Sequence, residues 1–87
     1  MLKKSVVFHC EEDMEMKAVA MLIQKASTFS SSLWLQTGER RANAKSLLGV
    51  MSLGISDGCS IEISADGADE NEAVDEIGAY LEAPTFN

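Results

Sequence analysis

A strand, a tight turn, a second strand and a short helix follow one another in residues 33–54, LWLQTGERRANAKSLLGVMSLG. Leu33-Trp34-Leu35 is typical of a strand, and Thr37-Gly38-Glu39 predicts a hairpin turn. The chain is predicted to return as a short strand from Arg40 to Asn43. Strands joined by so short a turn pair antiparallel, so we expect an antiparallel sheet.

Ser46 comes directly before the apolar helix predicted over residues 47–53. Serine is a favoured N-cap, and the first N–H groups of a helix point outward. A phosphoryl group on Ser46 would add a charge of about −2 at a helix start, where the dipole favours an anion. From this local chemistry alone an unmodified capping serine is favoured, because capping serines are common.

The segment before this stretch predicts a strand and a helix. Ser5-Val6-Val7-Phe8 is rich in β-branched and aromatic residues, as strands are. A helix is predicted from about Met16 to Ser27, with Asp13 as the better N-cap by residue type. Its apolar positions recur at helical spacing and are Met16, Val19, Ala20, Ile23 and Ala26.

The segment after it predicts one more strand and one more helix. Ile61-Glu62-Ile63 alternates like a strand with one wet face. Asp69-Glu70-Asn71-Glu72 has the pattern of a capping box, and Pro84 is expected to end the helix that follows. The apolar face of this helix is predicted to hold Ala73, Val74, Ile77, Tyr80 and Leu81.

The predicted order of elements is βαββαβα, within a chain of 87 residues. That length suits one small domain, which we expect to span residues 1–87. Four strands need cover on one face, and three helices can supply it. The fold class expected is therefore α+β, an open-faced two-layer sandwich of a four-stranded antiparallel sheet with three helices on one face.

The charge of the chain excludes some classes of partner. Its 14 acidic and 7 basic residues give a net charge of −7, and residues 46–87 contain no basic residue. Nucleic acids and anionic membranes require a basic face, so we expect neither as a direct partner. The chain has no long apolar run and no secretion signature, which predicts a cytoplasmic protein. Cys10 and Cys59 are expected to be free, buried thiols.

Few residues carry chemistry of their own. His9 is the only histidine, and no second spaced ligand pair accompanies it, so no metal site and no cofactor are predicted. A cluster of carboxylates is interpreted as a solvated helix start rather than as an acid–base pair; it comprises Glu11, Glu12, Asp13 and Glu15. No nucleophile–base pair is evident, so we do not expect an enzyme.

Methionine and leucine side chains suggest a protein-binding surface. Methionine adapts to several partners, and exposed apolar patches on small domains mark binding sites. The residues concerned are Met14, Met16, Met21, Leu47, Leu48 and Met51. Residue type alone does not separate such a surface from a core.

The stretch from Asn43 to Gly54 resembles the HPr family of bacterial phosphocarriers and its Crh-like branch. The similarity continues through Ile63 to Ala73, Leu22 to Ser27 and Phe29, and it spans about residues 2–82. The fold that this resemblance implies is βαββαβα with all helices on one face of the sheet. It agrees with the pattern of the residues.

The resemblance also implies a lost relay site. The phosphocarrier motif of the family is a histidine, a spacer, an arginine and a proline, and these positions fall here on Glu15, Lys17 and Ala18. Without the imidazole we expect no phosphoryl transfer to sugar-transport proteins. Glu15 either imitates a phosphorylated histidine or is an ordinary acid at a helix start, and the second interpretation is favoured.

The regulatory serine of the family falls on Ser46. The resemblance implies an HPr kinase/phosphorylase as the modifying enzyme and a LacI-type catabolite regulator as the partner of the phosphorylated form. Lys17 and Lys45 are expected near the phosphate, with Arg40 and Arg41 further along a basic rim. The partner face implied by the family comprises Met16, Lys17, Ala20, Met21, Gln24, Leu47, Leu48 and Met51.

The function expected is thus an HPr-like regulatory protein of carbon catabolite control, switched by phosphoserine. Two alternatives stay open. The first alternative is a degenerate HPr domain that binds a partner without modification. The second is a phosphocarrier that uses Glu15 or His9. In the last case other proteins of the phosphotransferase system would be its partners.

Overall fold

The computed structural model describes residues 1–84, so residues 85–87 of the predicted single domain lie outside the described part. The strands are β1 (Leu2–Val7), β2 (Ser32–Thr37), β3 (Arg40–Asn43) and β4 (Ser60–Asp66). The helices are α1 (Glu15–Ser27), α2 (Leu47–Leu53) and α3 (Glu70–Glu82), and a short 3-10 helix, η1 (Glu12–Met14), precedes α1. The predicted βαββαβα order is confirmed, with η1 as an addition.

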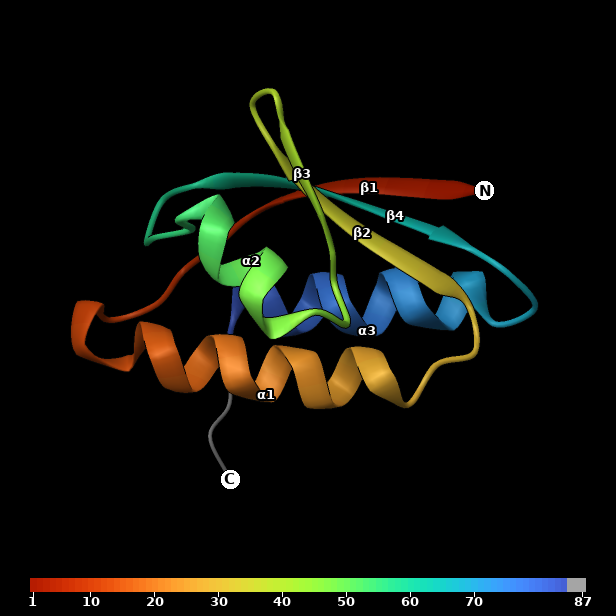
Figure 1. Cartoon of the computed structure of the whole chain (residues 1–87), viewed down its shortest axis with the longest axis horizontal. Coiled ribbons are helices and arrows are strands. Elements are labelled where there is room, and N and C mark those ends of the chain that lie inside the picture. The colour runs from red at the N-terminus through yellow and green to blue at the C-terminus, as the bar shows by residue number, and fades with distance from the viewer. Residues whose placement is uncertain (85–87) are drawn as a thin grey trace.

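The four strands form one antiparallel sheet in the order β1-β4-β2-β3. The hairpin of β2 and β3 turns at Gly38, whose φ of 58° a glycine adopts without strain. All three helices lie on the same side of the sheet (Figure 1). The predicted open-faced two-layer sandwich is therefore confirmed.

Alternation along the strands determines which face of the sheet is buried. Val6 of β1 lies opposite Ile61 of β4, while Ile63 of β4 lies opposite Leu35 of β2. These side chains point to the helices, because alternate residues of a strand share a face. They pack with buried side chains from the three helices, among them Leu22, Val50, Ile77 and Leu81. The predicted face of α3 is confirmed, since Ala73, Val74, Ile77, Tyr80 and Leu81 are buried.

The predicted core face of α1 is partly wrong. Its buried residues are Ala18, Val19, Leu22 and Ala26, whereas Met16 and Ala20 are exposed and Ile23 is half-buried. The buried Tyr80 hydroxyl of α3 donates a 2.8 Å hydrogen bond to the Ala18 carbonyl oxygen, and burial raises the pKa of Tyr80 to about 12. The buried face of α1 includes the small residues Ala18 and Ala26, which leave room for α3 to pack closely. The face that carries the larger Met16 stays exposed.

The predicted cap of α1 is also wrong. Asp13 lies within η1, and the N-cap residue is Met14, which makes no side-chain capping bond. The Met14 N–H donates to the Glu11 carbonyl oxygen at 2.9 Å instead. The chain thus enters α1 through a tighter turn, which places Asp13 before the helix start.

Asp69 holds the N-cap position of α3, but its carboxylate does not cap that helix. It accepts hydrogen bonds from the Ser30 N–H at 2.8 Å, from the Ser31 N–H at 2.9 Å and from the Ser31 hydroxyl. Of the predicted capping box only Glu70 bonds locally, accepting from the Gly67 N–H at 3.3 Å. Asp69 therefore ties the start of α3 to the loop before β2.

We expect Asp69→Asn to change how stability depends on pH. The hydrogen bond from the Ser31 hydroxyl, with the one from the Ser30 N–H, lowers the pKa of Asp69 from 3.8 to about 2. A carboxyl whose pKa is lower in the folded state stabilises the fold above pH 3.8, and this contribution is lost as the pH falls through 2. Urea unfolding should show the variant less stable at neutral pH, with the difference from wild type shrinking as the pH falls through this window. A difference that stays constant with pH would contradict this role.

Cys10 and Cys59 form no disulfide, as predicted, but both are half-buried rather than buried. Their backbones join the loops at one end of β1, where the Phe8 N–H donates to the Cys59 carbonyl oxygen at 2.8 Å. Burial, together with nearby carboxylates, raises the pKa of the Cys10 thiol. A raised pKa lowers the thiolate fraction and so the reactivity of this cysteine.

Candidate functional site

Ser46 is the N-cap of α2, as the sequence predicts. Its hydroxyl oxygen accepts a 3.1 Å hydrogen bond from the Gly49 N–H, and its own N–H donates to the Asn43 carbonyl oxygen at 3.0 Å. The Asn43 side chain accepts from the Lys45 N–H at 2.8 Å, which shapes the turn into the helix. Gly54 ends α2 with a φ of 65°. The serine hydroxyl is half-buried at the start of a helix of 7 residues.

Exposed apolar side chains surround this turn. Among the described residues, four of the six large hydrophobic side chains that are exposed come from α1 and α2: Met16 (61%), Leu47 (45%), Leu48 (80%) and Met51 (43%). Ala20 and Gln24 are also exposed on α1, while Met21 is half-buried and packs against the core. An apolar surface on two adjacent helices suits contact with another protein.

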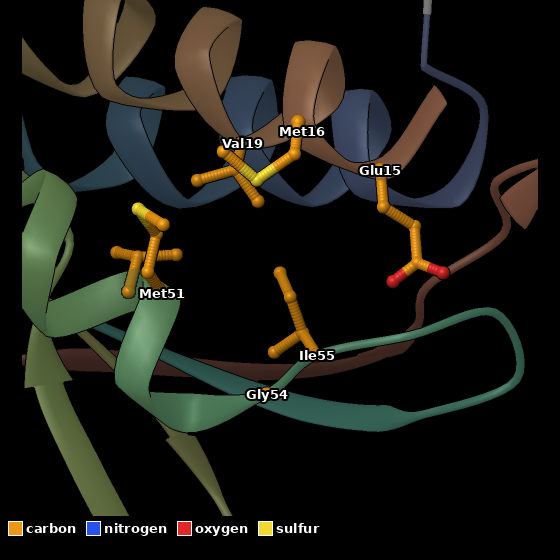
Figure 2. Close-up of a pocket in the computed structure, with 7 residues that line it drawn as sticks. Glu15, Met16, Val19, Met51, Gly54 and Ile55 are labelled. Carbon is orange, nitrogen blue, oxygen red and sulfur yellow. The ribbon is translucent and has the colours of Figure 1, made fainter. Parts of the chain in front are cut away.

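A hollow of about 190 Å³ lies between α1 and α2. Its lining residues are Glu15, Met16 and Val19 of α1, Val50 and Met51 of α2, and Gly54 and Ile55 after α2. Figure 2 shows Met16 and Met51 on facing walls and the Glu15 carboxylate at one end. The hollow was not predicted, because it forms only where the two helices meet and no pattern within either one indicates it.

The basic side chains near the site are held by different parts of the chain. The Lys45 ammonium donates a 2.7 Å hydrogen bond to the Phe29 carbonyl oxygen, just beyond the end of α1. Arg40 donates to the Ser52 carbonyl oxygen at 3.1 Å, near the C-terminal end of α2. The guanidinium of Arg41 lies 4.6 Å from the centre of the Trp34 ring, while Lys17 is exposed on α1. The Lys45 and Arg40 side chains are thus bonded to backbone carbonyl oxygens and not to Ser46.

The two candidate acceptors other than serine lie apart. Glu15 is the first residue of α1 and lines the hollow. His9 lies beyond β1, where its N–H donates to the Leu81 carbonyl oxygen at 3.1 Å, and its Nδ1 is 3.8 Å from the Asp57 carboxylate. The structure therefore does not bring His9 and Glu15 together in the hollow.

The composition and packing of residues 1–84 also bear on metal binding and on membrane insertion. No three histidine, cysteine, aspartate or glutamate side chains in this part gather as a metal-binding group would. Within the same range, no helix has the length and apolar content that crossing a membrane needs.

Known proteins resemble this chain in sequence and in fold. Residues 2–83 match the family described as PTS HPr component phosphorylation site. The HPr-like protein Crh of Bacillus subtilis is 32% identical over 82 residues, which cover 94% of this chain and 96% of Crh. The crystal structure of HPr-C-His from Thermoanaerobacter tengcongensis has a TM-score of 0.90 at 34% identity, covering 95% of this chain and 93% of that one. HPr of Bacillus anthracis follows with a TM-score of 0.88 at 30% identity, covering 92% and 95%.

Proposed function

This chain belongs to the HPr family, and on that premise we propose that it regulates carbon catabolism through phosphorylation of Ser46. It is an HPr-like, Crh-like protein, and its relatives are named as phosphocarriers and HPr-like proteins rather than as enzymes. The observation that carries the proposal is the position of one hydroxyl: Ser46 caps α2 beside the exposed side chains of Leu47 and Leu48.

The chemistry of the cap supports modification at Ser46. A phosphoryl group would add a charge of about −2 next to the outward N–H groups at the start of α2, where it is stabilised rather than disruptive. The fold would stay the same while the surface around Leu47 and Leu48 changed from neutral to anionic. Such a local change in charge is enough to select a partner.

The proposed modifying enzyme is an HPr kinase/phosphorylase, and the proposed partner of the phosphorylated form is a LacI-type catabolite regulator. Exposed Leu48 and Met51 would form the apolar centre of the contact, and Lys17 would add a positive charge at its edge. The full face proposed for both partners comprises Met16, Lys17, Ala20, Met21, Gln24, Leu47, Leu48 and Met51.

We expect the kinase to add one phosphoryl group to this protein. Incubation with ATP and an HPr kinase/phosphorylase should raise the intact mass by one phosphoryl group. Ser46→Asn should abolish the addition, because asparagine caps a helix as well as serine but carries no hydroxyl. Ser52→Ala is the matched control, since Ser52 lies on the same helix with its hydroxyl bonded to the Leu48 and Gly49 carbonyl oxygens.

Phosphorylation of Ser46→Asn at the wild-type rate would place the modification elsewhere. No phosphorylation of the wild-type protein would instead favour the alternative of an unmodified binding module. That alternative needs no modified serine, and the exposed apolar side chains of α1 and α2 support it.

We also expect this protein to take no phosphoryl group from enzyme I. The relay position holds Glu15, and the following Lys17 lacks the forked guanidinium that binds phosphate at two points. Incubation with enzyme I and phosphoenolpyruvate should therefore leave the mass unchanged, while an HPr with the histidine gains one phosphoryl group in the same mixture. Transfer to this chain that is lost in Glu15→Gln or His9→Gln would restore the phosphocarrier alternative.

A further inference from the structure

The hollow between α1 and α2 combines apolar walls with one carboxylate. Five of its lining residues have apolar side chains, the sixth is Gly54, and the seventh is Glu15. The carboxylate stands at one end, and the side chains of Met16 and Met51 face each other across the space (Figure 2). A ligand that fills this space must have an apolar stem and a head that suits a carboxylate.

Acidic groups dominate this end of the molecule. Glu11, Asp13 and Glu15 lie close together in sequence at the start of α1, and Asp57 lies in the loop before β4. Burial first, and then these carboxylates, raise the pKa of the Cys10 thiol. No basic residue of the described part lines the hollow, and the Lys45 and Arg40 side chains donate to the Phe29 and Ser52 carbonyl oxygens. The site therefore favours a positively charged ligand.

We propose that this hollow receives an arginine side chain from a partner protein. The aliphatic stem would lie between Met16 and Met51, and the guanidinium would pair with the Glu15 carboxylate. An arginine fits better than a wholly apolar side chain, which would strip water from Glu15 and leave it unpaired. It also fits better than a lysine, because a planar fork matches a carboxylate at two points and is less strongly hydrated.

This inference rests on the proposed function only in that the hollow lies within the proposed partner face. It adds a chemical requirement for the partner: an arginine must project from its contact surface. Glu15 then acts in specificity, since a partner that presents an acidic side chain here would be repelled.

The test uses a small probe in place of the partner. The full chain with ¹³C-labelled methionine methyl groups is titrated with n-butylguanidinium and, separately, with n-butylurea, its neutral analogue of similar shape. The guanidinium should shift the Met16 and Met51 methyl signals to saturation and leave Met21 unchanged. Butylurea, and the guanidinium with Glu15→Gln, should bind about two- to fivefold more weakly, as expected for a half-exposed ion pair.

Glu72→Gln is the matched control, because Glu72 is an exposed acid on α3 and does not line the hollow. It should bind the guanidinium as the wild-type protein does. Equal affinity for the two probes, no effect of Glu15→Gln, or no saturable shift at Met16 and Met51 would overturn the proposal. No kinase and no phosphate enter the titration, so its failure would leave the proposal for Ser46 standing.

Discussion

Gly67→Ala should destabilise the fold far more than other glycine substitutions do, by about 3 kcal/mol or more. Gly67 follows β4 with a φ of 154°, and a Cβ built on it would lie 2.6 Å from the Ser31 hydroxyl oxygen and 2.7 Å from the Ser31 Cα. A side chain can rotate away, but the backbone of Ser31 is held by the hydrogen bond from its N–H to the Asp69 carboxylate. To relieve the clash, the β4–α3 loop must therefore move away from the loop before β2.

Gly54→Ala is the matched control for this prediction. Gly54 has a φ of 65°, but a Cβ built on it would meet no atom within 4 Å, so only the backbone strain of about 1 kcal/mol applies. Urea unfolding of both variants gives the comparison directly. Thermal unfolding checks it, since a loss of 1 kcal/mol shifts Tm by about 4–8 °C in a domain of this size. Similar losses for the two variants would show that contact with Ser31 contributes nothing.

The sequence predicts best those features that residues close in the chain determine together. The hairpin at Gly38 and the capping serine at Ser46 each need only a few neighbouring residues, and both are present as expected. The order of elements follows from the same local patterns. In each case the physical cause is local: a glycine that adopts a positive φ at a turn, or a hydroxyl that accepts from an N–H three residues later.

The predictions from sequence are wrong where a residue contacts a segment that is distant in the chain. Asp69 has the residue type and position of a cap, but its carboxylate instead accepts hydrogen bonds from the N–H groups of Ser30 and Ser31, which are 39 and 38 residues away. Along α1, Met16 and Ala18 both lie on apolar stripes of helical spacing, and packing against other elements, such as Tyr80 of α3 on Ala18, determines which stripe is buried. The hollow that Glu15 lines is also a product of packing between elements.

Misplacing the core face of α1 has a direct functional consequence. A buried Met16 would be a core residue, whereas the exposed Met16 lines the hollow together with the exposed Met51 of α2. Residue type left core and binding surface undecided for these side chains. Their exposure shows that Met16, Leu47, Leu48 and Met51 are not core residues, so that their contribution to binding can be measured apart from stability.

Leu48→Ala should weaken the reaction with HPr kinase/phosphorylase about five- to thirtyfold in kcat/KM, and to a similar extent the binding of a LacI-type regulator to the phosphorylated form. Leu48 is 80% exposed, so its truncation removes little from the core, and alanine is an excellent helix former. The free energy of unfolding should therefore change by less than about 0.5 kcal/mol. A large apolar side chain at the centre of a contact commonly carries about 1–2 kcal/mol of binding, which sets the expected loss.

Val7→Thr is the matched control for the docking face. Val7 is another exposed hydrophobic residue, but it lies on β1, and threonine keeps its β-branched shape. This variant should keep the wild-type rate and affinity. Val7 follows the buried Val6 and so points to the open side of the sheet, whereas the helices of the proposed face lie on the other side (Figure 1). If Leu48→Ala and Val7→Thr behave alike, the partners do not dock on α2, and exposed apolar area there has another cause. If Leu48→Ala alone loses binding while its stability is unchanged, the loss belongs to the contact itself.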